Sequence, residues 1–321
     1  MKVTYVIPVL LLSLASTFAQ AATLPGIPEF IDEMVAKHHF NRAELESVFA
    51  HAQQRPAIID AISRPATIKP WLEYRAAFVN PQRIKLGLEF WDEFALTLRR
   101  AEKQYGVPQE IIIAVIGVET IYGRNAGNFR TIDALTTLAF DYPRRAEFFR
   151  SELEQFLLLA REQQFDLLEV RGSYAGALGI PQFMPGSYRK YAVDYNGNHT
   201  VDLLHEPRDA IGSVANYLQG YGWRRGEPVA VLAHVEGGSC ACDAKTQRSV
   251  AAWAASGVSA SVALPPEQPA RLMDFTVENG KEFWLGLNNF DVITRYNNSD
   301  FYAMSVFQLA EALKAARKRQ E

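Results

Sequence analysis

The stretch "AVIGVETIYGRN", residues 114–125, is an apolar run that ends in a carboxylate, Glu119, and breaks at Gly123. The segment around it, "VPQEIIIAVIGVETIYG", has Pro108 in a first-turn position and the length of a helix buried on most sides. A buried, unpaired carboxylate is costly, so it should be neutralised, paired or put to use. The helix dipole and the apolar neighbours both favour the protonated form, which suits a general acid. A glutamate that faces solvent, or one paired with Arg124, fits the same residues about equally well.

The segments before and after this helix predict a mainly α fold with a small β-containing subdomain. "NRAELESVFAHAQ" opens with a capping-box pattern of Asn41 and Glu44, and "LEFWDEFALTLRRAEKQYG" has helical spacing and stops at Gly106. After residue 225 the pattern changes: "EPVAVLAHVEG" is β-like, and the segment up to about residue 285 is rich in small residues, prolines and turns. The end, "DFYAMSVFQLAEALKAARKRQ", is helical again.

Bulk composition indicates an exported globular protein. The chain has 321 residues, 48% hydrophobic, and a formal net charge of −3, which gives no basic excess for binding nucleic acid. Its first residues, with Lys2, an apolar stretch and a small-x-small site at 19–21, predict a cleavable signal peptide over residues 1–21. Pro8 disfavours a membrane anchor, no cysteine near the cleavage site offers a lipid attachment point, and no later apolar run is long enough to span a bilayer.

The two cysteines, Cys240 and Cys242, stand in "GGSCACDA". Two ligands are too few for a structural zinc site, and a bridge across one intervening residue would be strained. We expect loop thiols or a local clip without a catalytic role.

A second motif, "GSYAGALGIPQFMPGSY", places Gly176, Gly179 and Gln182 in a G-x-x-G-x-x-Q arrangement. Glycines can let a ligand approach the backbone closely, and Ser173, Gln182 and the aromatic residues offer the polar groups and ring faces that a sugar needs. A glycine-rich turn without any ligand fits this motif as well.

Together, these motifs resemble the lytic murein transglycosylase B family of the goose-type lysozyme group. The resembling segments are "GVETIYGRNAGNFRTIDALTTLAFDYPRRAEFF", "GSYAGALGIPQFMPGSYRKYAVDYNGN", "DAIGSVANYL" and "FWLGLNNFDVITRYNNSDFYAMSV". The resemblance covers about residues 70–312 and implies a lysozyme-like (α+β) core. It also implies a periplasmic enzyme that binds peptidoglycan glycan strands, needs no cofactor, and works within complexes of cell-wall synthesis and hydrolysis.

The resemblance also implies roles for individual residues. Glu119 matches the catalytic acid and base, and Ser173 and Gln182 match polar groups around the reacting sugar. Residues that match the lining of the glycan groove are Tyr74, Tyr217, Tyr296, Asn297 and Tyr302. In this family one glutamate protonates the β-1,4 glycosidic oxygen after N-acetylmuramic acid. It then deprotonates the 6-hydroxyl, so that a 1,6-anhydro ring closes without water.

A calcium loop is a further implication. "DYNGNHTVD" begins like an EF-hand loop, but His199 replaces the usual glycine and the final glutamate is missing. The ligands that the resemblance implies are Asp194, Asn196, Asn198, the Thr200 carbonyl and Asp209. With so few carboxylates the affinity should be low, and a solvated turn without metal is an equal alternative.

Three functions remain open at this point: a lytic transglycosylase, a hydrolytic muramidase in which Asp133 or Asp141 assists water, and a catalytically weak peptidoglycan-binding or scaffolding protein.

The sequence predicts that the chain has four parts. A signal peptide (1–21) is followed by an N-terminal helical region (22–105), which packs with the C-terminal helix (303–321). The catalytic core (106–225) is completed by residues 286–302, and the β-containing insertion spans residues 226–285.

Overall fold

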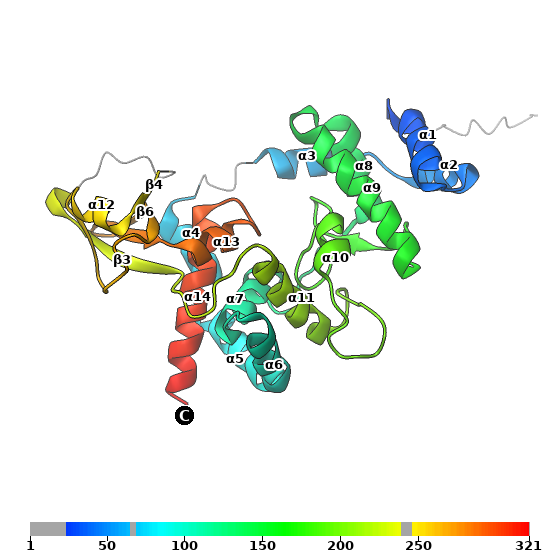
Figure 1. Ribbon diagram of the computed structural model, residues 1–321. Helices are drawn as coiled ribbons and strands as arrows, with labels where there is room; N and C mark the ends of the chain where they lie inside the picture. Colours follow the sequence, from blue (N-terminus) through cyan, green and yellow to red (C-terminus); the bar gives the residue numbers. More distant parts are fainter. Residues whose placement is uncertain (1–23, 65–68, 239–245, 321) are drawn as a thin grey trace, which may run out of the picture. The chain divides into compact units, whose positions relative to one another are not determined.

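The computed structural model describes residues 24–64, 69–238 and 246–320. The predicted signal peptide and both cysteines lie outside these residues. The described chain is mainly helical with a small five-stranded sheet and a two-stranded one, which confirms the predicted fold class (Figure 1). In this part of the chain no helix is both long and apolar enough to cross a bilayer.

The chain divides into two compact units with a boundary after His51. In the first, α1 (Ile27–His38) packs on α2 (Arg42–His51) through edge-to-face contact of Phe30 and Phe49, whose ring centroids are 6.0 Å apart. The Asn41 side chain accepts the Glu44 backbone N–H at 3.2 Å, which is the predicted cap of α2. The later helices of the predicted N-terminal region (22–105) belong to the second unit.

The second unit is built around α7 (Gln109–Thr120). Around it lie α5 (Pro81–Glu93), α6 (Ala95–Tyr105), α11 (Pro207–Gly220) and α14 (Asp300–Lys318), all of which contact α7. The "LEFWDEFALTLRRAEKQYG" stretch forms two helices, since the backbone breaks at Phe94, and Gly106 ends the second with φ 77° as predicted. A helix enclosed on so many sides explains the β-branched "III" run, which packs against neighbours all round.

A second group of helices packs together near the glycine-rich motif. It comprises α3 (Pro56–Ser63), α8 (Thr131–Asp141), α9 (Ala146–Gln163) and α10 (Pro185–Tyr191), with a 3-10 turn at Pro143–Arg145 where the proline interrupts the helical pattern. Helix α9 contacts α8 and α10, and α3 contacts α8. A two-stranded sheet pairs β1 (Phe129–Arg130) with β2 (Arg171–Gly172). This pair is too short to leave a period-two signal in the sequence, and it was not predicted.

The small subdomain is a five-stranded antiparallel sheet in the order β4-β6-β7-β3-β5. Its strands are β3 (Ala230–Val235), β4 (Gln247–Ser249), β5 (Val258–Ala260), β6 (Pro269–Val277) and β7 (Gly280–Gly286). Helix α12 (Val250–Ala254) buries Trp253 against one face, and the Trp253 indole donates to the Ala270 carbonyl at 2.9 Å. After the sheet, α13 (Asn288–Thr294) leads into α14, and α4 (Trp71–Phe78) contacts both α14 and β6.

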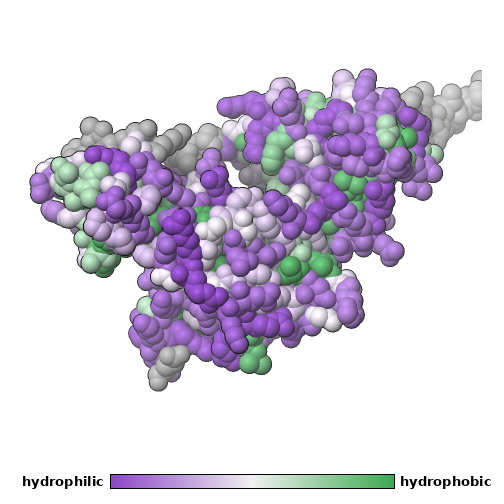
Figure 2. All heavy atoms as spheres, viewed as in Figure 1, coloured by the Kyte–Doolittle hydropathy of each residue, from purple (hydrophilic) through white to green (hydrophobic). Residues whose placement is uncertain are grey.

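The face of the molecule in Figure 2 is mostly hydrophilic, with small hydrophobic groups scattered over it. Individually exposed apolar residues are ordinary on protein surfaces and need no special explanation. Two of them, Leu232 and Val262, are 45% and 52% exposed and line a pocket that is described below.

Candidate active site

Glu119 differs in solvent exposure from the residues around it in α7. Every residue from Glu110 to Thr120 is buried apart from Glu119, which is partly exposed. Glu119 is therefore the one partly exposed residue at the end of a helix whose side chains from Glu110 onward are otherwise enclosed. Arg124 does not pair with it, because its guanidinium instead donates to the Ile121 carbonyl.

The hydrogen-bond partner of Glu119 is the buried Tyr302 of α14, whose hydroxyl donates to Oε1 at 2.5 Å. Desolvation raises the pKa of Glu119 from 4.5 to about 7, although the Tyr302 hydrogen bond acts in the opposite direction. Burial also raises the pKa of Tyr302 well above its ordinary value, so this phenol remains a donor at neutral pH. The site therefore holds a carboxyl group that exists in both protonation states near neutral pH.

The other predicted tyrosines also lie near this carboxylate. Its negative charge contributes to raised pKa values at Tyr74, Tyr217 and Tyr296, after the larger effect of desolvation. Tyr217 and Tyr296 have ring centroids 4.7 Å apart, and Tyr296 stacks on Tyr302 at 6.4 Å. Four tyrosines from three separate parts of the chain thus surround one glutamate.

Two of these hydroxyls have structural partners. Tyr217 donates to the Arg295 carbonyl and Tyr296 to the Pro181 carbonyl, both at 2.6 Å. These bonds tie the segment before α14 to α11 and to the glycine-rich loop. Tyr217 is itself buried and its ring packs within the cluster, whereas Tyr296 is partly exposed and can offer its ring to a sugar.

The glycine-rich loop joins the catalytic helix through Thr120, whose hydroxyl donates to the Ile180 carbonyl at 2.8 Å. The Gln182 amide donates to the carbonyls of Ala126 and Gly179 at 3.0 and 2.9 Å, and its backbone is left-handed at φ 52°. Ser173 accepts the Ala177 N–H at 3.1 Å. Gln182 and Ser173 therefore hold the loop's shape in this structure.

Asn297, predicted to line the glycan groove, is exposed and follows Tyr296 in the chain.

The structure favours the second of the two interpretations of these glycines, a turn that packs on its own protein. A Cβ on Gly176 would lie 2.4 Å from the Leu135 side chain, and one on Gly179 would lie 2.2 Å from the Leu203 carbonyl oxygen. Both have positive φ, at 82° and 69°. Glycine is needed here so that the loop can turn and pack on its own protein, and these Cβ positions do not face a ligand.

The backbone that follows Glu119 is unusual and was not predicted. Ile121, Tyr122 and Gly123 are all left-handed, with φ of 54°, 59° and 82°, although a β-branched residue strongly disfavours this region. α7 therefore ends at Thr120 and not at Gly123.

Arg83 and Tyr122 hold this turn in place. The Tyr122 hydroxyl donates to the Arg83 carbonyl at 2.9 Å, and the Arg83 guanidinium donates to the Gly117 carbonyl. The Tyr122 ring packs so closely on Gly117 that a Cβ there would lie 2.6 Å from its hydroxyl oxygen. A trace of this turn in the sequence "GVETIYG" is Gly117, two residues before the glutamate. That Gly117 makes room for the Tyr122 ring can be seen only in the folded structure.

The second-carboxylate alternative has little support from geometry. Asp133 is buried, with Arg130 and Arg55 donating to its oxygens at 2.9 to 3.2 Å and the Gln53 backbone N–H donating at 2.9 Å. Asp141 accepts from Gln54 at 2.5 Å. Both acids anchor the segment before α3 to α8, and Asp133 is enclosed by these bonds.

The predicted calcium loop is closed by its own hydrogen bonds. Asp194 accepts the backbone N–H groups of Gly197, Asn198 and His199 at 2.7 to 3.3 Å. Asn196 and Asn198 each accept the N–H two residues further on at 2.8 Å, and the second of these bonds comes from Thr200. In the described residues no group of three or more His, Cys, Asp or Glu is placed to hold a metal.

Asp209, the last residue of the predicted calcium set, is fully buried in the first turn of α11. Its oxygens accept three backbone N–H groups, from Tyr195, Asn196 and Asp202, at 2.8 to 3.2 Å. Asp209 therefore joins both ends of the loop to the helix.

Comparison with known proteins gives a consistent result. Residues 23–311 match the family model described as the transglycosylase SLT domain. The chain is 44% identical over 306 residues to membrane-bound lytic murein transglycosylase B of Escherichia coli strain K12, covering 92% of this chain and 84% of that protein.

Two solved proteins have the same fold. The catenated lytic transglycosylase SltB1 of Pseudomonas aeruginosa is 48% identical, with a TM-score of 0.87 over 91% of this chain and 98% of that one. The E. coli lytic transglycosylase Slt35, solved with bulgecin A and with calcium, is 45% and 44% identical, with a TM-score of 0.87 over 92% of this chain and 95% of that one. The resemblance seen in the motifs is thereby confirmed, and the chain belongs to the transglycosylase SLT domain family.

Proposed function

We propose that this enzyme is a lytic transglycosylase that cleaves the β-1,4 bond between N-acetylmuramic acid and N-acetylglucosamine in peptidoglycan, leaving 1,6-anhydromuramoyl ends. The observation that carries the proposal is a single carboxyl group, Glu119, with a pKa of about 7 and a tyrosine hydroxyl as its hydrogen-bond partner, while Asp133 is buried and held by two arginines. Ordinary glycosidases of both stereochemical classes use a pair of carboxylates, whereas a transglycosylase needs one.

The steps follow from this one group. Protonated Glu119 gives its proton to the glycosidic oxygen as the bond from that oxygen to C1 of the muramic acid breaks. The resulting Glu119 carboxylate takes the proton of the 6-hydroxyl, and O6 of the same sugar bonds to C1. Atoms balance without water, and Glu119 ends protonated, ready for the next cycle. A pKa of about 7 suits both roles, since neither protonation state is rare near neutral pH.

The tyrosines around Glu119 orient its carboxyl group and bound sugar rings during these steps. The Tyr302 hydroxyl, 2.5 Å from Oε1, fixes the carboxyl orientation and stabilises the carboxylate formed in the first step. The partly exposed rings of Tyr74 and Tyr296 offer apolar faces on which sugar rings can lie, and the buried Tyr217 ring packs against Tyr296.

Product analysis is the test of this function. Murein digested by the purified protein is expected to yield 1,6-anhydro-muropeptides by mass spectrometry. A hydrolytic muramidase would instead give muropeptides one water heavier with reducing ends, and a scaffolding protein would give no cleavage. Either of these results would overturn the proposal.

We also propose that the loop from Asp194 to Asp209 binds calcium weakly, as a structural ion only. An amide or carboxylate oxygen that accepts one N–H retains a further lone pair for a cation. His199, with φ 69°, takes the left-handed position that glycine usually supplies in such loops. The loop backbone therefore has a suitable shape for calcium. Because few of its ligands are carboxylates, its calcium affinity should be low.

Calcium is expected to raise the thermal unfolding midpoint. At calcium about tenfold above Kd, linkage predicts about 1.4 kcal/mol, or about 3 °C for a chain of this size. Midpoints are compared in calcium and in chelator, with magnesium as the ionic control, and Asp194→Asn should lose the shift. Equal midpoints in calcium and chelator would contradict the proposal.

For location we propose the periplasm, reached through the predicted signal peptide without lipidation, and association with cell-wall synthesis or hydrolysis complexes. The basis is the charged, apolar and small-x-small pattern of residues 1–21. The E. coli relative is membrane-bound by name. Fractionation of cells that produce the full chain is expected to place the mature protein in the periplasmic fraction.

A further inference from the structure

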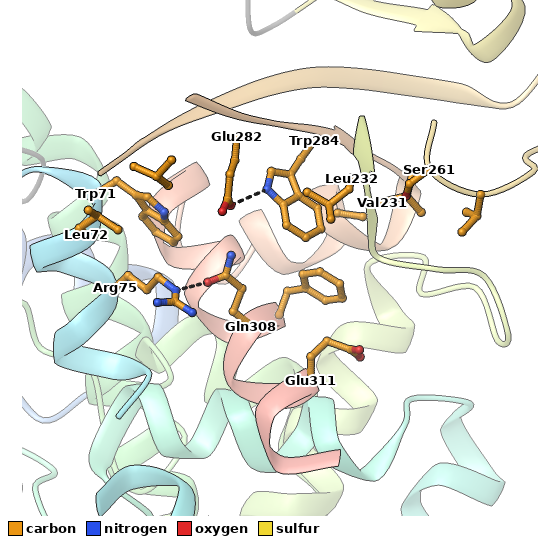
Figure 3. A pocket seen from close by; sticks show the side chains of 14 residues that line it. Trp71, Leu72, Arg75, Val231, Leu232, Ser261, Glu282, Trp284, Gln308 and Glu311 are labelled. Carbon is orange, nitrogen blue, oxygen red and sulfur yellow. Dashed lines mark hydrogen bonds between the residues drawn. The ribbon is translucent and has the colours of Figure 1, made fainter. Parts of the chain in front are cut away.

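A pocket of about 590 Å³ lies between the sheet and the helices α4 and α14, and Glu119 does not line it (Figure 3). Its apolar walls include Trp71, Leu232, Trp284 and Phe307. Its volume falls in the range of small-molecule sites, which are typically apolar with a few convergent polar groups.

Three charged side chains point into this pocket: Arg75 from α4, Glu282 from β7 and Glu311 from α14. None of the three forms an ion pair in the part of the chain that the structure describes; Arg75 donates to Gln308, and Glu282 accepts from the Trp284 indole at 3.4 Å. Figure 3 shows Arg75 and Glu311 toward opposite ends of the pocket, with Gln308 between them. A ligand that suits these walls carries a carboxylate and an amine several ångströms apart on a partly apolar body.

The pocket is joined to the active site by an aromatic layer. Phe301 contacts Trp71 of the pocket wall, with ring centroids 5.2 Å apart, and also Tyr74 beside Glu119, at 5.5 Å. Along α14, Gln308 and Glu311 are six and nine residues beyond Tyr302, which corresponds to about 9 and 14 Å of helix rise. An extended peptide of four residues spans about 13 Å, which is comparable with this helix rise.

We propose that this pocket binds the stem peptide of peptidoglycan, with a peptide carboxylate on Arg75 and the free amine of its diamino acid at Glu311. The inference rests on the proposed function, because the stem peptide is the amine- and carboxylate-bearing group that such a substrate carries. The pocket then selects glycan strands by their peptide, separately from the chemistry at Glu119.

Direct binding is the first test. The probe is the free tetrapeptide L-Ala-γ-D-Glu-meso-diaminopimelyl-D-Ala, titrated calorimetrically into the full-length Glu119→Gln protein. Arg75→Gln and Glu311→Gln, each added to that protein, are expected to weaken binding about five- to tenfold, as charge-assisted hydrogen bonds in a half-open pocket do. The matched controls, Arg99→Gln and Glu278→Gln, change exposed residues outside the pocket and should bind as the parent does. No binding at millimolar peptide, or binding unchanged in the pocket variants, would overturn the inference.

Turnover separates this inference from the proposed function. With Glu119 intact, Glu311→Gln is expected to lower kcat/KM about fivefold on peptide-bearing glycan and to leave it unchanged on glycan stripped of peptides by an amidase. An equal loss on both substrates would mean that the pocket binds sugar or only supports the fold. If the wild-type protein cleaved neither substrate, the proposed function itself would fail, whereas the calorimetric result would stand.

Discussion

Glu119→Gln is expected to reduce murein cleavage by at least about 10³-fold, since one side chain acts in turn as acid and base and each role contributes about 10²–10⁴-fold. Glutamine has the same shape and can still accept the Tyr302 hydrogen bond, so the surroundings of the site should not change. Its amide does not give up a proton near neutral pH, and no other carboxylate in the described site is free to replace it. Release of anhydro-muropeptides over time is the measurement.

The control for this variant lies on the same helix. Glu110→Gln also changes a glutamate of α7, but Glu110 lies in the first turn of the helix and pairs with Lys314 at 2.9 Å. This variant should keep its activity with some loss of stability. If Glu119→Gln retained activity within tenfold of wild type, or if Glu110→Gln were equally inactive, the assignment of Glu119 would be wrong.

The pH dependence of the free energy of unfolding provides a second test of Glu119→Gln. Because the folded pKa, about 7, lies above the unfolded value of 4.5, folding favours the protonated carboxyl group. Its contribution is fully present below pH 4.5 and is lost as the pH rises through 7. Relative to wild type, the glutamine variant should therefore gain about 3 kcal/mol between pH 4.5 and pH 8, as measured by urea unfolding.

Asp209→Ala is expected to cost about 3–5 kcal/mol of unfolding free energy, the largest stability effect of any substitution considered for this protein. The carboxylate is fully buried and accepts three backbone N–H groups. Alanine leaves all three without a partner, and it also removes a negative charge from the first turn of α11, where the helix dipole favours one.

Chelator separates this structural role from calcium binding. Urea unfolding of Asp209→Ala in EDTA should show the full loss, because the three hydrogen bonds do not involve a metal. Asp209→Asn keeps one acceptor oxygen and should lose about half as much. A loss below about 1 kcal/mol in chelator would contradict the structural role and favour a residue that acts only as a metal ligand.

The sequence predicts the elements of this protein better than their junctions. Gly106 and Asn41 mark helix ends by local chemistry, and both predictions are confirmed. The break at Phe94 and the left-handed turn at Ile121 have no local signal, because ring packing and the Tyr122 bond to Arg83 hold them in place. The boundary after His51 likewise depends on which helices pack together.

The same distinction holds for the site. A carboxylate that closes an apolar helix points to Glu119 directly. Its partner Tyr302 lies 183 residues away, so only the folded chain shows that the two meet. Gly176 and Gly179 are conspicuous in the sequence, but the atoms that make them necessary belong to Leu135 and Leu203 in other segments.

The protonation of Glu119 is the central claim, and titration of its side-chain carboxyl carbon by NMR tests it most directly. The signal is assigned by difference between wild type and Glu119→Gln. The structure predicts a midpoint near 7, set by desolvation against the Tyr302 hydrogen bond. A midpoint near 4.5, that of an ordinary glutamate, would contradict the account.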